Sequence, residues 1–169
     1  MHNHEPYTFC PKCAARLELQ VQSGEERPTC PACGWVQYED PKVACGALLL
    51  RGDHVLLVRR NMVPYTGLWS IPAGFVNAFE VPEDAVRREV REETGLEVEV
   101  EQLIAVLSGR EHPRGSDIFL VYKVRQVGGV LAAADDAGDA AWFKLDALPP
   151  LAFDTTRRIL AQASSLIDE

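Results

Sequence analysis

Residues 74–96 read GFVNAFEVPEDAVRREVREETGL, and this stretch decides how the rest of the chain is interpreted. Its acids Glu89, Glu92 and Glu93 are spaced so that they share one face of a helix. At about 100° per residue, Glu92 and Glu93 flank Glu89 at about 60° and about 40°, beside the apolar stripe of the same helix. Carboxylates crowded there repel one another unless a cation lies between them. Carboxylate oxygens suit hard ions, so the spacing predicts a Mg²⁺ or Mn²⁺ site; the alternative is a solvated acidic helix held by Arg–Glu pairs.

The same stretch resembles the Nudix box, the signature of the Nudix hydrolase family. The family pattern is a Gly, five residues, Glu, seven residues, Arg-Glu, an aliphatic residue, any residue, Glu-Glu, any residue, Gly and an aliphatic residue. Phe79 and Val81 stand where many members carry a Gly and a helix-capping Ser. Every gap of the pattern is matched in this chain, by Gly74, Glu80, Arg88, Glu89, Val90, Glu92, Glu93, Gly95 and Leu96.

This resemblance implies a role for each acid and for the arginine of the box. Glu89 and Glu93 are expected to be the principal ligands of Mg²⁺ or Mn²⁺. Glu92 is expected to be a ligand or the base that activates water. Arg88 is expected to orient a neighbouring glutamate, and Glu80 to provide a further ligand or a contact behind the ligands. The resemblance thus assigns catalysis to Arg88, Glu89, Glu92 and Glu93.

The segment before the box carries the resemblance further. Residues 67–74, GLWSIPAG, are similar to the family's approach to the box, with Ala73 in place of the first of two glycines. The family usually contributes a backbone carbonyl to a metal ion here, at the position of Ala73 or Gly74. The implied fold class is α/β, a Nudix α/β/α sandwich with a mixed sheet. Many relatives are homodimers, so the resemblance also implies a dimer.

The N-terminal part of the chain carries two pairs of cysteines. Each pair is a CxxC motif, and 16 residues separate the second cysteine of one pair from the first of the next. This arrangement predicts a structural Zn²⁺ site with four thiolate ligands and no open position for substrate; two redox CxxC pairs are the alternative. We therefore expect a zinc ribbon at residues 1–38 and the Nudix domain at residues 39–169, with Cys45 as a core residue. The predicted zinc ligands are Cys10, Cys13, Cys30 and Cys33.

Alternating and apolar runs predict the other elements. Gly128-Gly129 is expected to form a turn, and Asp154 to cap a final amphipathic helix. The predicted strands cover residues 16–22, 43–50, 54–60, 97–107, 117–125 and 140–144.

Several polar residues outside the box are candidates for contact with substrate. Arginine is a frequent phosphate ligand, and Arg59 and Arg60 end a predicted strand. An acid before the Trp-Phe pair of the last predicted strand serves some Nudix relatives as a ligand or base, and Asp135, Asp136 or Asp139 could do so here. The candidate substrate contacts are Arg59, Arg60, Arg110, Glu111, His112, Arg114 and Asp139.

The formal net charge of the chain is −8, from 17 basic and 25 acidic residues. This balance argues against nucleic acid and anionic membranes as partners, although bound metal ions allow a small nucleotide. No apolar run approaches the roughly 18 residues of a membrane span, and the start does not resemble a signal peptide. In a reducing compartment, cysteines are more often metal ligands than disulfides, so the predicted zinc site also leads us to expect a cytoplasmic protein.

The predicted reaction is hydrolysis of the pyrophosphate bond in a nucleoside diphosphate linked to another group, releasing a nucleoside monophosphate. The SQPWPFPxS signature of NADH pyrophosphatases is absent after the box, where the chain reads EVEVEQLIAVLSG. The chain resembles more the ribbon-bearing ADP-ribose/FAD pyrophosphatases of the family, which favours ADP-ribose and FAD, with NADH third. The alternative is a nucleotide sensor without catalysis, in which the ribbon binds protein or nucleic acid.

Overall fold

The computed structural model describes residues 7–109, 111, 117–134 and 137–163. The chain divides into two compact units, Met1–Pro41 and Lys42–Glu169.

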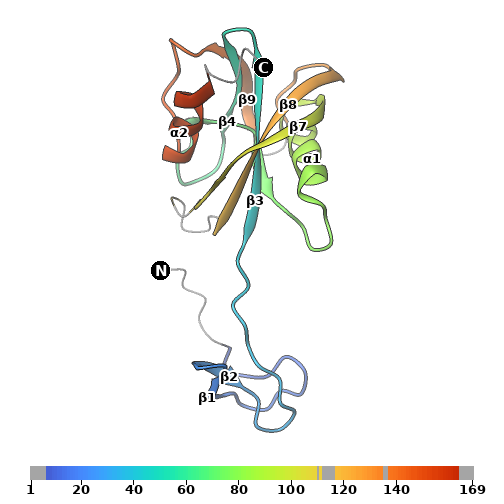
Figure 1. Cartoon of the computed structure of the whole chain (residues 1–169), viewed down its shortest axis with the longest axis vertical. Helices are drawn as coiled ribbons and strands as arrows, with labels where there is room; N and C mark the ends of the chain where they lie inside the picture. The colour runs from blue at the N-terminus through green and yellow to red at the C-terminus, as the bar shows by residue number, and fades with distance from the viewer. Residues whose placement is uncertain (1–6, 110, 112–116, 135–136, 164–169) are drawn as a thin grey trace. The chain divides into compact units, whose positions relative to one another are not determined.

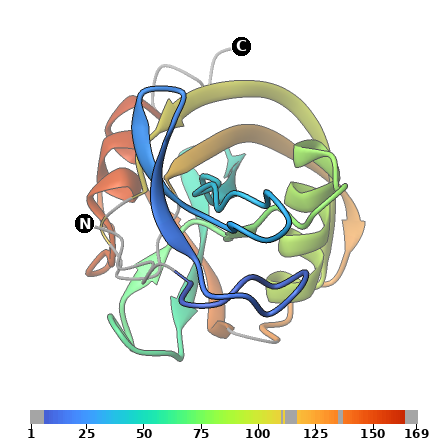
Figure 2. The ribbon, with the colours of Figure 1, turned by 90° about the horizontal axis from the view of Figure 1, so that it is seen from below.

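The first unit is built on one hairpin, seen in blue in Figure 2. Strands β1 (Glu18–Gln22) and β2 (Glu25–Thr29) pair antiparallel. Ser23 and Gly24 make the turn with φ values of 54° and 87°, and Gly24 tolerates this left-handed conformation because it lacks a Cβ. The strand predicted over residues 16–22 is confirmed, with β1 covering its last five residues.

The second unit is organised around a seven-stranded mixed sheet. Five of its strands follow the order β5-β4-β3-β8-β7, while β6 pairs with β3 and β9 pairs with β4. Among the described pairs, β3 and β8 run parallel and the others antiparallel. The strands are β3 (Val43–Arg51), β4 (His54–Arg60), β5 (Trp69–Ser70), β6 (Ala73–Phe75), β7 (Leu96–Leu107), β8 (Ile118–Gly129) and β9 (Ala137–Lys144).

Two helices cover opposite sides of this sheet, α1 (Pro82–Thr94) and α2 (Asp154–Ala163), as Figure 1 shows. The α/β/α expectation with a mixed sheet is therefore confirmed. Side chains of β3 alternate between two cores because successive residues of a strand point to opposite faces. Cys45 packs with the cluster that contains α1, and Leu48 with the cluster that contains α2. Neither described helix is long and apolar enough to cross a membrane.

The ends of α1 follow from its sequence. Pro82 occupies the first turn, where its missing N–H removes no helical hydrogen bond. Val81 provides no side-chain cap, but Glu83 and Asp84 place negative charge at the positive end of the helix dipole. Gly95 ends the helix in the left-handed conformation, with φ 69°, and its N–H donates to the carbonyl of Arg91.

Three predictions about local structure are wrong. Gly128-Gly129 forms no turn but extends β8, pairing with Glu97 and Leu96 at the start of β7. A Cβ on Gly129 would lie 2.7 Å from the Cα of Leu96, so glycine permits this close backbone approach. Strand β9 begins at Ala137 rather than at residue 140, because its pairing with β4 continues to Arg60.

The third error concerns the start of α2. Asp154 is the first helical residue and not the cap. Its backbone N–H and that of Thr155 donate instead to the carboxylate of Glu111, with 2.7 Å for Thr155. An acid from a distant loop therefore supplies the capping acceptor that we expected from Asp154.

Gly46 offers a test of the packing between the sheet and the α2 side of the core. A Cβ at this position would lie 2.6 Å from the Phe119 ring and 3.1 Å from Ile71. We predict that Gly46→Ala lowers the free energy of unfolding by about 1–3 kcal/mol, because the added methyl overpacks a closed site. Urea unfolding measures the loss. Gly138→Ala is the control, because the nearest atom to its new Cβ would be 3.4 Å away; equal stability of the two variants would contradict the packing.

Candidate active site

The inner face of α1 lines a cleft of about 520 Å³. Arg88, Glu89, Glu92 and Glu93 all border it, together with the β6 residues Ala73, Gly74 and Phe75. Glu93 is 9% exposed, and the side chains of Glu89 and Glu92 are 15% and 39% exposed. The three acids of the predicted helix face thus gather at one cleft and are not directed into bulk solvent.

In this structure, the cation among the carboxylates is the Arg88 guanidinium. It donates to Glu80 at 2.8 Å, to Glu89 at 2.6 Å and to Glu92 at 3.1 Å. It also donates to the backbone carbonyl of Phe75 at 3.0 Å, which joins the helix to β6. The predicted contact between Arg88 and neighbouring glutamates is therefore present, and it involves three acids rather than one.

The loop between β6 and α1 is held by the acid that precedes the helix. Glu80 accepts hydrogen bonds from Arg88 and, at 2.9 Å, from the backbone N–H of Asn77. Phe79 adopts φ 68° and its side chain is fully exposed. This is the left-handed conformation that glycine adopts more easily, which accounts for the Gly of many family members at this position.

Gly74 and Ala73 place β6 directly against two of the acids. A Cβ on Gly74 would lie 2.1 Å from carboxylate atoms of Glu89, so the Glu89 carboxylate lies over bare backbone. Glu93 accepts a hydrogen bond from the N–H of Ala73 at 3.0 Å. The predicted backbone contribution at Ala73 is, in this structure, an N–H donated to a glutamate.

Burial and the arginine shift the protonation of this cluster in opposite directions. Hydrogen bonds from Arg88, and then from Asn77, lower the pKa of Glu80 to about 2. Burial raises the pKa of Glu89 above its ordinary value, although Arg88 opposes the change. Burial, and then the charge of Glu89, raise the pKa of the Cys45 thiol to about 12. Cys45 is fully buried, which confirms that it is a core residue.

The box residues fit a divalent ion by chemistry. Their carboxylate oxygens are the hard donors that Mg²⁺ and Mn²⁺ prefer, and the missing side chain at Gly74 leaves room for the Glu89 carboxylate. Within the described part of the chain, however, no three carboxylates bring their oxygens within 4.8 Å of one another. Arg88 donates to Glu89 and Glu92, whereas Glu93 accepts its hydrogen bond from the Ala73 N–H.

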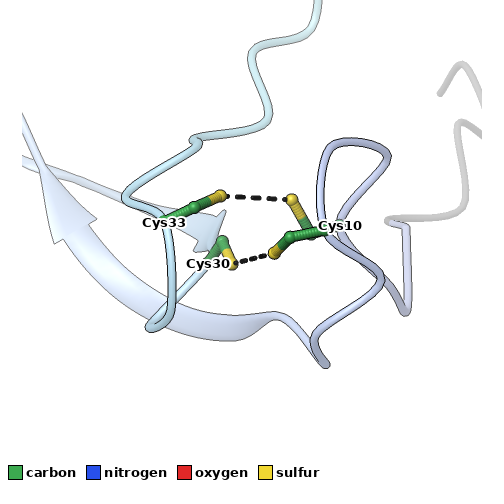
Figure 3. A group of neighbouring side chains, drawn as sticks. Cys10, Cys30 and Cys33 are labelled. Atoms are coloured by element: carbon green, nitrogen blue, oxygen red, sulfur yellow. Dashed lines mark hydrogen bonds between the residues drawn. The ribbon is translucent and has the colours of Figure 1, made fainter.

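The four cysteines of the first unit form a closed cluster. Their sulfur atoms all lie within 4.8 Å of one another, and Figure 3 shows part of the group. The Sγ atoms of Cys10 and Cys33 are 3.6 Å apart, and those of Cys13 and Cys30 are 3.5 Å apart. Four thiolates at this spacing fit a tetrahedral Zn²⁺.

The predicted substrate contacts divide into three groups. Arg59, Arg60 and Glu111 line the cleft. Arg59 lies 3.7 Å from Asp139 and 5.9 Å from the Trp69 ring centre. Asp139, on β9, is not among the residues that line the cleft. The third group lies outside the described residues and consists of Arg110, His112 and Arg114. Asp135 and Asp136, the alternatives to Asp139 as an extra ligand or base, also lie outside them.

Other residues of the cleft were missed from the sequence. Phe119, Ile71 and Phe153 provide apolar walls, and the Arg60 guanidinium lies 5.1 Å from the Phe153 ring centre. No local motif marks these positions, because strand pairing and the docking of α2 bring them to the site. The hydroxyl residues that line the cleft were also missed, namely Ser70, Thr155 and Thr156.

A mixed sheet between two helices, with an acid-lined cleft beside α1, is the arrangement expected of a Nudix hydrolase, and the comparisons with known proteins agree. The family described as NUDIX domain matches residues 40–163. The zinc-ribbon family described as Nudix N-terminal matches residues 8–39. The chain therefore belongs to the Nudix family.

Several relatives resemble the chain over most of its length. An ADP-ribose pyrophosphatase of Methanocaldococcus jannaschii is 42% identical over 118 residues, which cover 69% of this chain and 70% of the relative. An NAD-capped RNA hydrolase NudC of Pseudomonas aeruginosa is 41% identical over 145 residues, 85% of this chain but only 50% of the relative. A NUDIX hydrolase of Nitrosomonas europaea superposes with a TM-score of 0.82 at 26% identity, covering 94% of this chain and 93% of that one.

The pKa of Glu80 leads to a prediction for the metal-free protein. Because Arg88 lowers the pKa of Glu80 from 4.5 to about 2 in the folded state, the pair stabilises the fold above about pH 4.5. This contribution is lost as the pH falls toward 2. We expect Arg88→Gln to flatten the decline of the melting temperature between pH 4.5 and 2. Arg87→Gln, at an exposed arginine paired with Asp84, should leave the decline of the melting temperature as in the wild type. If the melting temperatures of all three proteins declined in parallel, the effect assigned to the Arg88–Glu80 pair would be wrong.

The cysteine cluster leads to a second prediction, on metal removal. We expect about one Zn²⁺ per chain, lost on chelation or in Cys30→Ser, because removing one thiolate opens the tetrahedral set. Elemental analysis measures the metal, and hydrogen exchange should show loss of protection in β1 and β2. Cys45→Ser is the matched control, because Cys45 lies outside the cluster. A Cys30→Ser protein with full zinc content would refute the ligand set.

Proposed function

We propose that the chain hydrolyses the pyrophosphate bond of a nucleoside diphosphate linked to another moiety, releasing a nucleoside monophosphate. One observation carries the proposal: the three acids Glu89, Glu92 and Glu93 line a single cleft that also contains Arg59 and Arg60. Such a cleft offers oxygen ligands for cations and guanidinium groups for phosphates within one space. It also matches membership of a family whose relatives include a named pyrophosphatase.

The proposal assigns Mg²⁺ or Mn²⁺ to Glu89, Glu92 and Glu93, with Glu80 and the backbone at Ala73 as further contacts. When bound, these ions neutralise diphosphate charge and both orient and acidify the attacking water. The chain's own residues prepare the site. Arg88 fixes Glu80, Glu89 and Glu92 in position, and burial keeps Glu89 and Glu93 against β6.

In this proposal, Arg59 and Arg60 have a different task from Glu92. Arg59 and Arg60 contact the diphosphate, because guanidinium groups bind phosphate oxygens in a bidentate manner. Glu92 is the most exposed of the three acids, with 39% of its side chain accessible, so it is best placed to accept a proton from water. In the first unit, we propose a structural Zn²⁺ held by Cys10, Cys13, Cys30 and Cys33, with residues 1–38 as the ribbon.

We propose ADP-ribose and FAD as preferred substrates, with NADH third. The likeness to an ADP-ribose pyrophosphatase at 42% identity supports this order. The chain spans about half the length of its NudC relative, an NAD-capped RNA hydrolase. An RNA-linked dinucleotide therefore belongs among the substrates to be tested, although the net charge of −8 disfavours a long polyanion. A sensor without catalysis is disfavoured because all box acids are present.

Activity assays test this function directly. We expect Mg²⁺-dependent release of a nucleoside monophosphate from ADP-ribose or FAD. Glu93→Gln and Glu92→Gln should each lower kcat by at least about 100-fold, because each removes a charge on which ligand binding or proton transfer depends. Glu97→Gln makes the same change outside the cleft and should keep the wild-type rate. Wild-type rates in both cleft variants, or nucleotide binding with no turnover, would overturn the proposal.

A further inference from the structure

Three of the residues that line the cleft carry hydroxyl groups. Ser70 on β5 and Thr155 and Thr156 on α2 all border it. They are 6%, 6% and 1% exposed, respectively. These three residues and Glu111 form what we call the hydroxyl pocket. Its members come from three distant segments of the chain, so no sequence motif marks it.

The three hydroxyls have no partner within the described part of the protein. No hydrogen bond joins the side-chain oxygen of Ser70, Thr155 or Thr156 to another described residue. Among the described side-chain atoms, only Arg27 Nε lacks both contact with solvent and a hydrogen-bond partner, so the three hydroxyl oxygens are not completely sealed. The three residues are nearly buried but line the cleft, so the cleft is the space in which their hydroxyl groups can find a further partner. Because nearly buried hydroxyls are usually hydrogen-bonded, these three are available to a polar group that enters the cleft.

Glu111 gives this pocket a fixed acceptor. Its carboxylate accepts hydrogen bonds from the backbone N–H groups of Asp154 and Thr155 at the start of α2. The Tyr65 hydroxyl donates to the Glu111 carbonyl at 3.1 Å, and the Tyr65 ring meets Phe153 edge-on at 5.4 Å. A carboxylate has about four acceptor sites, so roughly two remain for a ligand.

The charge and chemistry of the pocket select the kind of group that it can bind. The Glu111 carboxylate repels a phosphate or another carboxylate. An apolar ring would leave the hydroxyls of Ser70, Thr155 and Thr156 unpaired on losing water, which is costly. A neutral group with adjacent hydroxyls satisfies both requirements, because it donates to the carboxylate and exchanges hydrogen bonds with the three side chains.

We propose that the hydroxyl pocket binds the vicinal diol of a ribose in the substrate. The proposal deepens the function proposed above and rests on it for the identity of the substrate. Glu111 accepts hydrogen bonds from the diol, and Thr156 and its neighbours complete the contact. This makes the ribose, rather than an aromatic base, the group that the α2 side of the cleft recognises.

Deoxy substrates test the proposal. ADP-ribose is compared with two analogues, one lacking the 2′-hydroxyl of the adenosine ribose and the other lacking the 2-hydroxyl of the terminal ribose. We expect kcat/KM to fall by about 10- to 100-fold for one of them, because a hydrogen bond to a charged acceptor is lost. The analogue that is affected identifies the ribose. Equal kcat/KM values for all three substrates would overturn the inference.

Variants of the pocket should abolish this discrimination. Glu111→Gln and Thr156→Val should each reduce the ratio of kcat/KM between ADP-ribose and the affected analogue toward one. Thr156→Val should keep the wild-type melting temperature, because the Thr156 hydroxyl bonds to no described residue. This variant therefore still tests the pocket if Glu111→Gln destabilises the start of α2. Thr94→Val is the matched control: its buried hydroxyl donates to the Val90 carbonyl outside the cleft. It should lower stability but keep the ratio.

Calorimetry with the same three ligands, with Ca²⁺ in place of Mg²⁺, separates the two proposals. Diol-dependent binding without any turnover in Mg²⁺ would support the pocket and refute the hydrolase function. Turnover of all three substrates at one rate, with equal affinities, would support the function and refute the pocket.

Discussion

The structure of the active site depends on how one guanidinium holds several half-buried carboxylates together. Without Arg88, the acids Glu80, Glu89 and Glu92 would repel one another at the edge of the core. Removing one partner of a buried ion pair is costly because the remaining charges lose their compensation. Arg88 also bonds the Phe75 carbonyl, so the same interaction joins α1 to β6. The loop geometry and the orientation of the helix are thereby coupled to the charges of the site.

Glycine permits this arrangement at the point of closest approach. Gly74 lies against the Glu89 carboxylate, and any side chain there would displace the acid. On the next strand, Gly46 leaves room for the Phe119 ring in the opposite core. Strand β3 pairs with β6 and β8 at once, so it sets both contacts from the centre of the sheet. The carboxylates and the apolar wall of the cleft are therefore positioned by one strand.

The cleft combines two chemistries of different origin. The acids come from a single helical segment, and their spacing alone places them on one face. The hydroxyls of Ser70 and Thr156, and the carboxylate of Glu111, come from separate segments that meet only when α2 docks on the sheet. In the proposed reaction, the first part acts on the diphosphate and the second recognises the sugar.

The sequence by itself determined the helix of the box, the cysteine cluster and most strands, because these depend on short-range spacing and alternation. It also identified Arg59 and Arg60, which line the cleft. Only the tertiary structure decided that Gly128-Gly129 extends β8, because strand β7 needs a partner there. Likewise, Glu111 rather than Asp154 caps α2, and Arg88 lies among three acids. Such contacts join residues far apart in the chain or depend on side-chain orientation, so local pattern carries no signal for them.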